Sequence, residues 1–81
     1  MEPTGRIEEW VLWNGKIWGN IFDDKKGRFE DGIHIHTSSI VPEGQKCKEG
    51  AVITTRNSAY LLGKSMQERT NYAKNNQRIY I

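Results

Sequence analysis

Residues 10–22 read WVLWNGKIWGNIF and carry the strongest local structural signal in the chain. At its centre Asn14-Gly15 separates two apolar runs. Asn-Gly is the preferred pair for a two-residue hairpin turn of type I′, because both turn residues need a positive φ. A loop of two residues also determines the register of the two strands. We expect four cross-strand pairs: Trp13 with Lys16, Leu12 with Ile17, Val11 with Trp18, and Trp10 with Gly19.

Both faces of this predicted hairpin are apolar. One face carries Trp10, Leu12, Ile17 and Ile21, and the opposite face carries Val11, Trp13, Trp18 and Phe22. A chain of 81 residues can cover only one such face with its own core. We therefore expect the face with Trp13, Trp18 and Phe22 to be an interface with another molecule, a second copy of the chain included.

Three further strands follow along the chain. Residues 33–38 read IHIHTS and alternate with period two, which predicts a half-buried strand with Ile33 and Ile35 inward. Residues 51–55 and 59–62 are two more apolar or β-branched runs, separated by a turn. The sequence therefore predicts a mainly β fold: a small five-stranded antiparallel meander or an SH3-like barrel.

After Gly63 the pattern changes. Ser65 and Glu68 have the spacing of a capping box, which predicts a short helix over 66–74. Residues 79–81 are expected to form either an edge strand or an ordered tail. Residues 64–81 hold four basic residues against one acidic residue, whereas residues 1–63 hold eight against nine. We expect one domain over 1–81, with a β core over about 7–63 and a helix and basic tail over about 64–81.

The composition bounds the kinds of protein that fit. Twelve Lys and Arg against ten Asp and Glu give a net charge of +2, too mild for a histone-like coat on nucleic acid. No apolar run reaches the ~20 residues of a membrane helix, and the first residues lack the pattern of a secretory signal. The expected compartment is the cytoplasm.

Catalytic and metal-binding motifs are incomplete. His34 and His36 share a strand face, a real metal-ligand spacing, but the sequence holds no third histidine. His36-Thr37-Ser38 matches one copy of the His-x-Ser/Thr element of two-histidine phosphoesterases, which need two copies. The single Cys47 excludes a disulfide within the chain. We expect no enzyme activity, no cofactor and no metal.

The remaining polar residues suit an anionic ligand. Arg donates in a fork that matches phosphate, and Ser, Thr and Asn add short donors. The candidate ligand-binding residues are Arg28, His34, His36, Thr37, Ser38, Arg56, Asn57 and Ser58. Trp18, Phe29 and Tyr60 offer faces on which a base can stack.

Four segments carry a resemblance. Residues 13–19 (WNGKIWG), 28–32 (RFEDG), 35–38 (IHTS) and 54–63 (TTRNSAYLLG) resemble small β-rich proteins encoded by phages and prophages. The resemblance implies a counter-defence or host-takeover role in a bacterial host. Proteins of that class usually act by binding: they sequester cyclic-nucleotide or ADP-ribose-type signals, or they block a host effector protein.

Three functional hypotheses follow. The first is a homo-oligomeric, non-enzymatic module that sequesters a small anionic, nucleotide-like ligand. The second is an inhibitor that blocks a host protein through Trp13, Trp18 and Phe22, since Trp is enriched at interface hot spots. The third is a small RNA- or DNA-binding β domain that uses the aromatic residues of the sheet and the basic tail.

Overall fold

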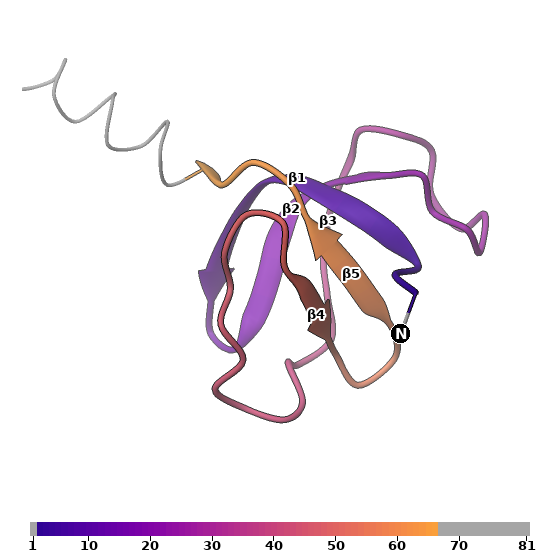
Figure 1. The fold of residues 1–81 in the computed structure, drawn as a ribbon. Helices are drawn as coiled ribbons and strands as arrows, with labels where there is room; N and C mark the ends of the chain where they lie inside the picture. The colour runs from indigo at the N-terminus through magenta and orange to yellow at the C-terminus, as the bar shows by residue number, and fades with distance from the viewer. Residues whose placement is uncertain (1, 67–81) are drawn as a thin grey trace, which may run out of the picture.

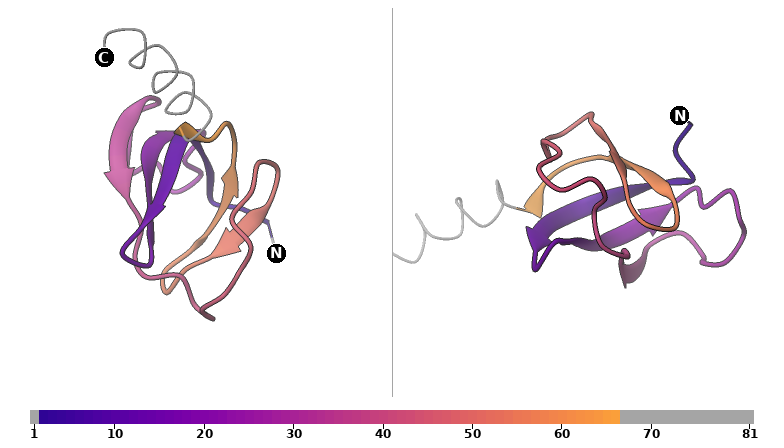
Figure 2. Two further views of the ribbon diagram at one scale, coloured as in Figure 1. Left: turned by 90° about the vertical axis from the view of Figure 1, so that its left-hand side faces the viewer. Right: turned by 90° about the horizontal axis from the view of Figure 1, so that it is seen from below.

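The computed structural model describes residues 2–66, which form one five-stranded sheet (Figure 1). The strands are β1 (Gly5–Trp13), β2 (Lys16–Phe22), β3 (Ile33–His36), β4 (Val52–Thr54) and β5 (Ala59–Leu62). Their order across the sheet is β3-β2-β1-β5-β4. The sheet curls, so that the strands run round from β3 on one side to β4 on the other (Figure 2). Among the described residues, no helix has the length and hydrophobicity needed to cross a membrane.

The sheet is mixed and open, which corrects the predicted antiparallel meander or SH3-like barrel. β1 pairs antiparallel with β2 but parallel with β5. Direction alternates from each strand to the next, so the first and fifth strands run the same way and must pair in parallel as neighbours. The β3 and β4 sides meet at an isolated bridge between Ile40 and Thr55, not along a continuous ladder. The predicted helix, beyond its first residue, and the predicted strand over 79–81 lie outside the described residues.

The first hairpin has the predicted turn and three of the four predicted pairs. Asn14 and Gly15 both have positive φ, at 55° and 71°. The three confirmed pairs join Trp13 with Lys16, Leu12 with Ile17, and Val11 with Trp18.

The fourth predicted pair is wrong because β1 bulges. Glu8 pairs with Asn20 and Val11 with Trp18, so Glu9 and Trp10 together lie opposite Gly19. Glu9 takes a left-handed conformation with φ 51°, as the first residue of one type of bulge does. The extra residue shifts by one position the side chains of β1 that face the core.

The bulge turns both Ile7 and Trp10 toward the core, where they are 0% and 4% exposed. Strict alternation would place two residues three positions apart on opposite faces. Both belong to a buried cluster with side chains of β2, β4 and β5: Ile17, Ile21, Ile53, Tyr60 and Leu62. The indole Nε1 of Trp10 donates to the carbonyl oxygen of Gly63 at 2.9 Å, which joins β1 to the chain that follows β5.

Two side chains expected inside are exposed. Leu12 lies on the core side of its strand but is 51% exposed, because it stands near the tip of the hairpin, beyond the buried cluster. Ile33 is 45% exposed at the start of the edge strand β3, whereas Ile35 packs against the core as predicted. Of the two isoleucines predicted to face inward, only Ile35 therefore packs against the core.

The short edge strand β4 is capped by a side chain. The amide of Gln45 donates to the Thr54 carbonyl oxygen at 2.9 Å and accepts from the Thr54 N–H at 2.9 Å. A neighbouring strand would occupy the same two backbone groups. An exposed sheet edge invites pairing with other chains, and Gln45 blocks part of this one.

Gly19 is required opposite the bulge. A Cβ at this position would lie 2.6 Å from Ile7 Cγ2, 2.8 Å from the Glu8 carbonyl oxygen and 3.0 Å from Trp10 Cα. We expect Gly19→Ala to lower the free energy of unfolding by about 3 kcal/mol, since backbone atoms of β1 must shift. Urea unfolding followed by tryptophan fluorescence measures this.

Gly15→Ala is the matched control. A Cβ there meets nothing within 4 Å, so only the positive φ of 71° opposes it, at a cost of about 1 kcal/mol. If Gly19→Ala destabilises the protein no more than Gly15→Ala does, the close approach at the bulge is not a structural requirement.

Candidate functional site

Three rings form a row on the outer face of the sheet, the face opposite the core. Trp13 of β1 meets Trp18 of β2 edge to face, with ring centroids 5.7 Å apart and planes at 63°. Trp18 in turn lies against His36 of β3, with centroids 4.6 Å apart and planes at 35°. Trp13 is 63% exposed. We call Trp13, Trp18 and His36 the aromatic row.

Hydrogen bonds to the backbone hold two of these rings. The Trp18 indole Nε1 donates to the Trp13 carbonyl oxygen at 3.1 Å. His36 Nδ1 lies 3.3 Å from the Thr37 carbonyl oxygen. A carbonyl oxygen only accepts, so Nδ1 carries the hydrogen. These two bonds fix the orientation of the Trp18 and His36 rings.

Polar and aromatic residues continue the outer face beside the row. His34 Nδ1 contacts the Asn20 Oδ1 atom across the β2–β3 ladder at 3.1 Å. Further along, the Arg6 guanidinium lies over the Phe22 ring, 5.1 Å from its centroid. The face therefore combines rings that can stack with side chains that can donate or accept hydrogen bonds.

Arg6 is tied to two carboxylates. It bonds Glu8 at 2.6 Å and Asp23 at 2.7 Å. The hydrogen bond to Glu8 raises the pKa of Arg6 above its usual value, and the bond to Asp23 acts in the same direction. All three predicted interface residues, Trp13, Trp18 and Phe22, lie on the outer face, but Phe22 is partly covered by Arg6.

The predicted ligand-binding residues lie in several places. His34 and His36 are on the outer face of β3. Thr37 is buried, and its hydroxyl accepts from the Ile17 N–H at 3.1 Å and donates to the Ser38 carbonyl oxygen at 2.7 Å. The Thr37 hydroxyl is thus used to join β2 to the end of β3.

A second group of predicted ligand-binding residues lies where the β3 and β4 sides of the sheet meet. The Asn57 N–H donates to Ser38 Oγ at 3.2 Å, and the Arg56 N–H donates to the Ser39 carbonyl oxygen at 3.0 Å. Ser58 Oγ accepts from Lys26 Nζ at 2.8 Å. The structure brings Ser38, Arg56 and Asn57 together through the backbone N–H groups of Arg56 and Asn57, which join the turn between β4 and β5 to the chain after β3.

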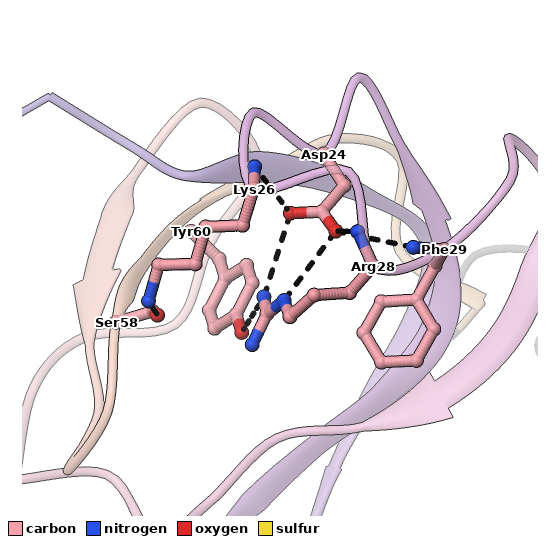
Figure 3. A network of polar contacts seen from close by, with 6 residues as sticks. All are labelled: Asp24, Lys26, Arg28, Phe29, Ser58 and Tyr60. Carbon is pink, nitrogen blue, oxygen red and sulfur yellow. Dashed lines mark hydrogen bonds and ion pairs between the residues drawn. The ribbon is translucent and has the colours of Figure 1, made fainter.

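Arg28 belongs to a network in the β2–β3 loop (Figure 3). The Asp24 side chain is fully covered and accepts from the Arg28 N–H at 2.8 Å, the Phe29 N–H at 3.3 Å and the Arg28 side chain at 3.4 Å. Arg28 also donates to the Tyr60 hydroxyl at 3.2 Å. Two nitrogens of the guanidinium, Nε and Nη2, are therefore bonded within the protein, and the side chain is 36% exposed.

The electrostatics of this loop follow from these contacts. Burial of the Asp24 carboxyl opposes its ionisation, but the hydrogen bonds from the Arg28 side chain and from loop amides outweigh it. The pKa of Asp24 is lowered as a result. The hydrogen bond to Tyr60 and the contact with Asp24 raise the pKa of Arg28.

A shallow groove of about 330 Å³ lies away from the aromatic row. Leu12 and Ile40 line it together with Gly44 and Gln45, and none of the predicted ligand-binding residues does. The Gln45 amide is already bonded to Thr54. The groove therefore offers mainly apolar and backbone surface.

Within residues 2–66, no three His, Cys, Asp or Glu side chains come together as a metal site. Cys47 is half-buried, its thiol lies 3.7 Å from the Gln45 carbonyl oxygen, and burial raises the pKa of the thiol. A raised pKa disfavours the reactive thiolate at neutral pH.

Sequence reasoning missed the contact between His36 and Trp18. It placed His36 on the outward face of its strand, but it had no register between β2 and β3. A loop of ten residues, 23–32, joins these strands, and loop length specifies register only in tight hairpins. The outward alternation of residues 33–36 was the only available signal.

Asp24 makes stability depend on pH in a defined window. Its folded pKa lies below its unfolded value, so its contribution is complete above about pH 4 and is lost as pH falls through the folded pKa. We expect Asp24→Asn to lower the free energy of unfolding at pH 7 by about 1–2 kcal/mol. The gap between the variant and the wild type should narrow below pH 4, as measured by urea unfolding from pH 7 to pH 2.

Glu2→Gln provides the control. The Glu2 side chain is 92% exposed, and its Oε2 atom lies 3.8 Å from Lys25 Nζ. Its stability curve should follow the wild type at every pH. A constant gap between Asp24→Asn and the wild type down to pH 2 would show that ionisation of Asp24 does not anchor the loop.

Comparison of the chain with protein-family models, curated proteins and solved structures found no match in any of the three. The comparisons therefore support no family and no activity. The resemblance to small phage-encoded proteins stays an expectation.

Proposed function

We propose that this chain is a non-enzymatic module that binds single-stranded nucleic acid on the outer face of β1, β2 and β3. Bases stack on the rings of Trp13, Trp18 and His36. The observation that supports the proposal is the aromatic row itself, with Trp13 63% exposed and Trp18 and His36 in ring contact. Base stacking on exposed aromatic side chains is how many sheet-based modules hold single strands.

An open face suits an oligonucleotide better than a small ligand. Sites for small molecules usually enclose most of the ligand surface. The aromatic row lies on the outside of a sheet, and the groove between Leu12 and Gln45 is elsewhere. Each stacked base contributes about 1–3 kcal/mol, so a row of rings gains affinity by holding successive bases of one chain. This favours an oligonucleotide over the small nucleotide-like ligand predicted first.

Because basic and acidic residues balance, stacking contributes more to the affinity for nucleic acid than charge attraction does. Residues 2–66 contain nine basic and nine acidic residues. On the outer face, Arg6 is paired with Glu8 and Asp23. Long-range attraction to a polyanion is therefore modest. We expect a moderate fall of affinity with salt, not the steep fall of proteins that neutralise many phosphates.

A second candidate function is the blocking of a host protein by the same hairpin. Leu12 and Trp13, adjacent at its tip, are 51% and 63% exposed. Trp is enriched among the residues that dominate protein interfaces, and the exposed Leu12 beside it enlarges the apolar surface at the tip. Sequestering and blocking both need only binding, so either is compatible with the phage-type role implied by the resemblance.

The test measures binding of fluorescein-labelled 12-nucleotide DNA and RNA by anisotropy at low salt. Trp13→Ala should weaken binding by tenfold or more, since it removes one stacking ring. Leu12→Ala is the matched control: it removes an exposed neighbour with no ring and should leave the dissociation constant unchanged. Native mass measurement of the same sample tests the predicted homo-oligomer.

The competing functions predict different outcomes. Mononucleotides or cyclic dinucleotides that bind as tightly as the oligonucleotides would support the small-ligand hypothesis instead. If neither DNA nor RNA binds at low salt, or if Trp13→Ala binds like the wild type, the nucleic-acid proposal is wrong. A purified protein partner whose affinity falls equally with Leu12→Ala and Trp13→Ala would favour the blocking function.

A further inference from the structure

Two histidines stand side by side on the proposed binding face. His34 and His36 are both exposed on β3, two positions apart, which places their Cα atoms about 7 Å apart on the same face. His36 is part of the aromatic row, and His34 pairs across the ladder with Asn20. A chain stacked on His36 therefore lies within one strand step of His34.

The contacts of the two rings identify which nitrogen faces a ligand. Nδ1 of His36 contacts a backbone carbonyl oxygen, and Nδ1 of His34 contacts the Asn20 amide oxygen. Both oxygens accept, so in each neutral ring Nδ1 carries the hydrogen and Nε2 has the lone pair. Nε2 is therefore the nitrogen that can accept a proton, and within residues 2–66 the hydrogen bonds of both rings are made by Nδ1.

No carboxylate within the described residues forms an ion pair with either imidazole. Glu8, which faces Asn20 from β1, is bonded to Arg6 and to the Lys64 N–H. Asp31, before β3, accepts from the Asp23 N–H. The charged groups on the elements around the two rings are Lys16 on β2, Arg6, Glu8 and Glu9 on β1, and, in the β2–β3 loop, Asp23, Asp24, Lys25, Lys26, Arg28, Glu30 and Asp31.

We infer that Nε2 of His34 and Nε2 of His36 form a phosphate-binding subsite beside the aromatic row. The inference rests on the proposed function and names the part of the nucleic acid that these residues contact. A protonated imidazole donates its Nε2–H to a phosphate oxygen in a charge-assisted hydrogen bond. A neutral ring presents a lone pair there and cannot donate. We therefore expect affinity for a single strand to be higher at acid pH than at pH 8.

The pH dependence can be tested with two substitutions, because the chain contains only two histidines and both are in this subsite. The experiment measures binding of a fluorescein-labelled oligo(dT) 12-mer to the full chain at pH 8.0 and pH 5.5, each over a salt series. For the wild type we expect binding about tenfold tighter at pH 5.5 at low salt. The slope of log affinity against log salt should steepen by about 0.7 for each phosphate contacted, hence by about 1.4 for two.

The variants separate the phosphate contact from stacking and from folding. His36→Phe keeps a ring against Trp18 but cannot be protonated, and His34→Gln keeps a polar partner for Asn20. Each single variant should lose about half of the added salt slope, and the double variant should bind equally at both pH values. Thermal unfolding of the double variant at each pH shows whether the fold is retained.

Each outcome decides between the two proposals. If Trp13→Ala abolishes binding but wild-type affinity does not change with pH, the stacking function stands and the phosphate subsite is wrong. A double variant that still binds tighter at pH 5.5 also overturns the subsite. If the oligonucleotide binds at neither pH, the proposed function itself fails.

Discussion

The bulge at Glu9 and Trp10 opposite Gly19 is the constraint on which the rest of the structure depends. It brings Ile7 and Trp10 into one core although they are three positions apart on a strand. Without it, one of these two large side chains would face solvent, and the indole bond from Trp10 to Gly63 would be lost. A core built from so few side chains has no substitute for either.

The same bulge determines what the outer face carries. Beyond it, Val11 and Trp13 point outward, and the two-residue turn sets Trp18 against them with the required register. One hairpin thus supplies the centre of the core on one side and the aromatic row on the other. The two opposite faces of the hairpin explain why Trp13, the most exposed large hydrophobic residue of those described, lies only three positions from the buried Trp10.

Polar anchors complete the fold where strands are short. Asp24 organises the β2–β3 loop, Gln45 caps the β4 edge, and Thr37 joins β2 to the end of β3. These side chains satisfy backbone groups that a longer sheet would pair with another strand. Several residues that look like ligand-binding groups in the sequence, Arg28 and Thr37 above all, are used in this structural work.

Local chemistry in the sequence determined the type I′ turn, the pairs near it, the existence of five short strands and the outward position of His34 and His36. These depend on φ preferences and on alternation, which act over a few residues. Only the tertiary structure decided the parallel pairing of β1 with β5, the bulge, the covering of Phe22 by Arg6 and the stacking of His36 on Trp18. Some of these features join residues that are far apart in the sequence. The others depend on which side chains fill the one small core. The spacing of neighbouring residues encodes neither kind of feature.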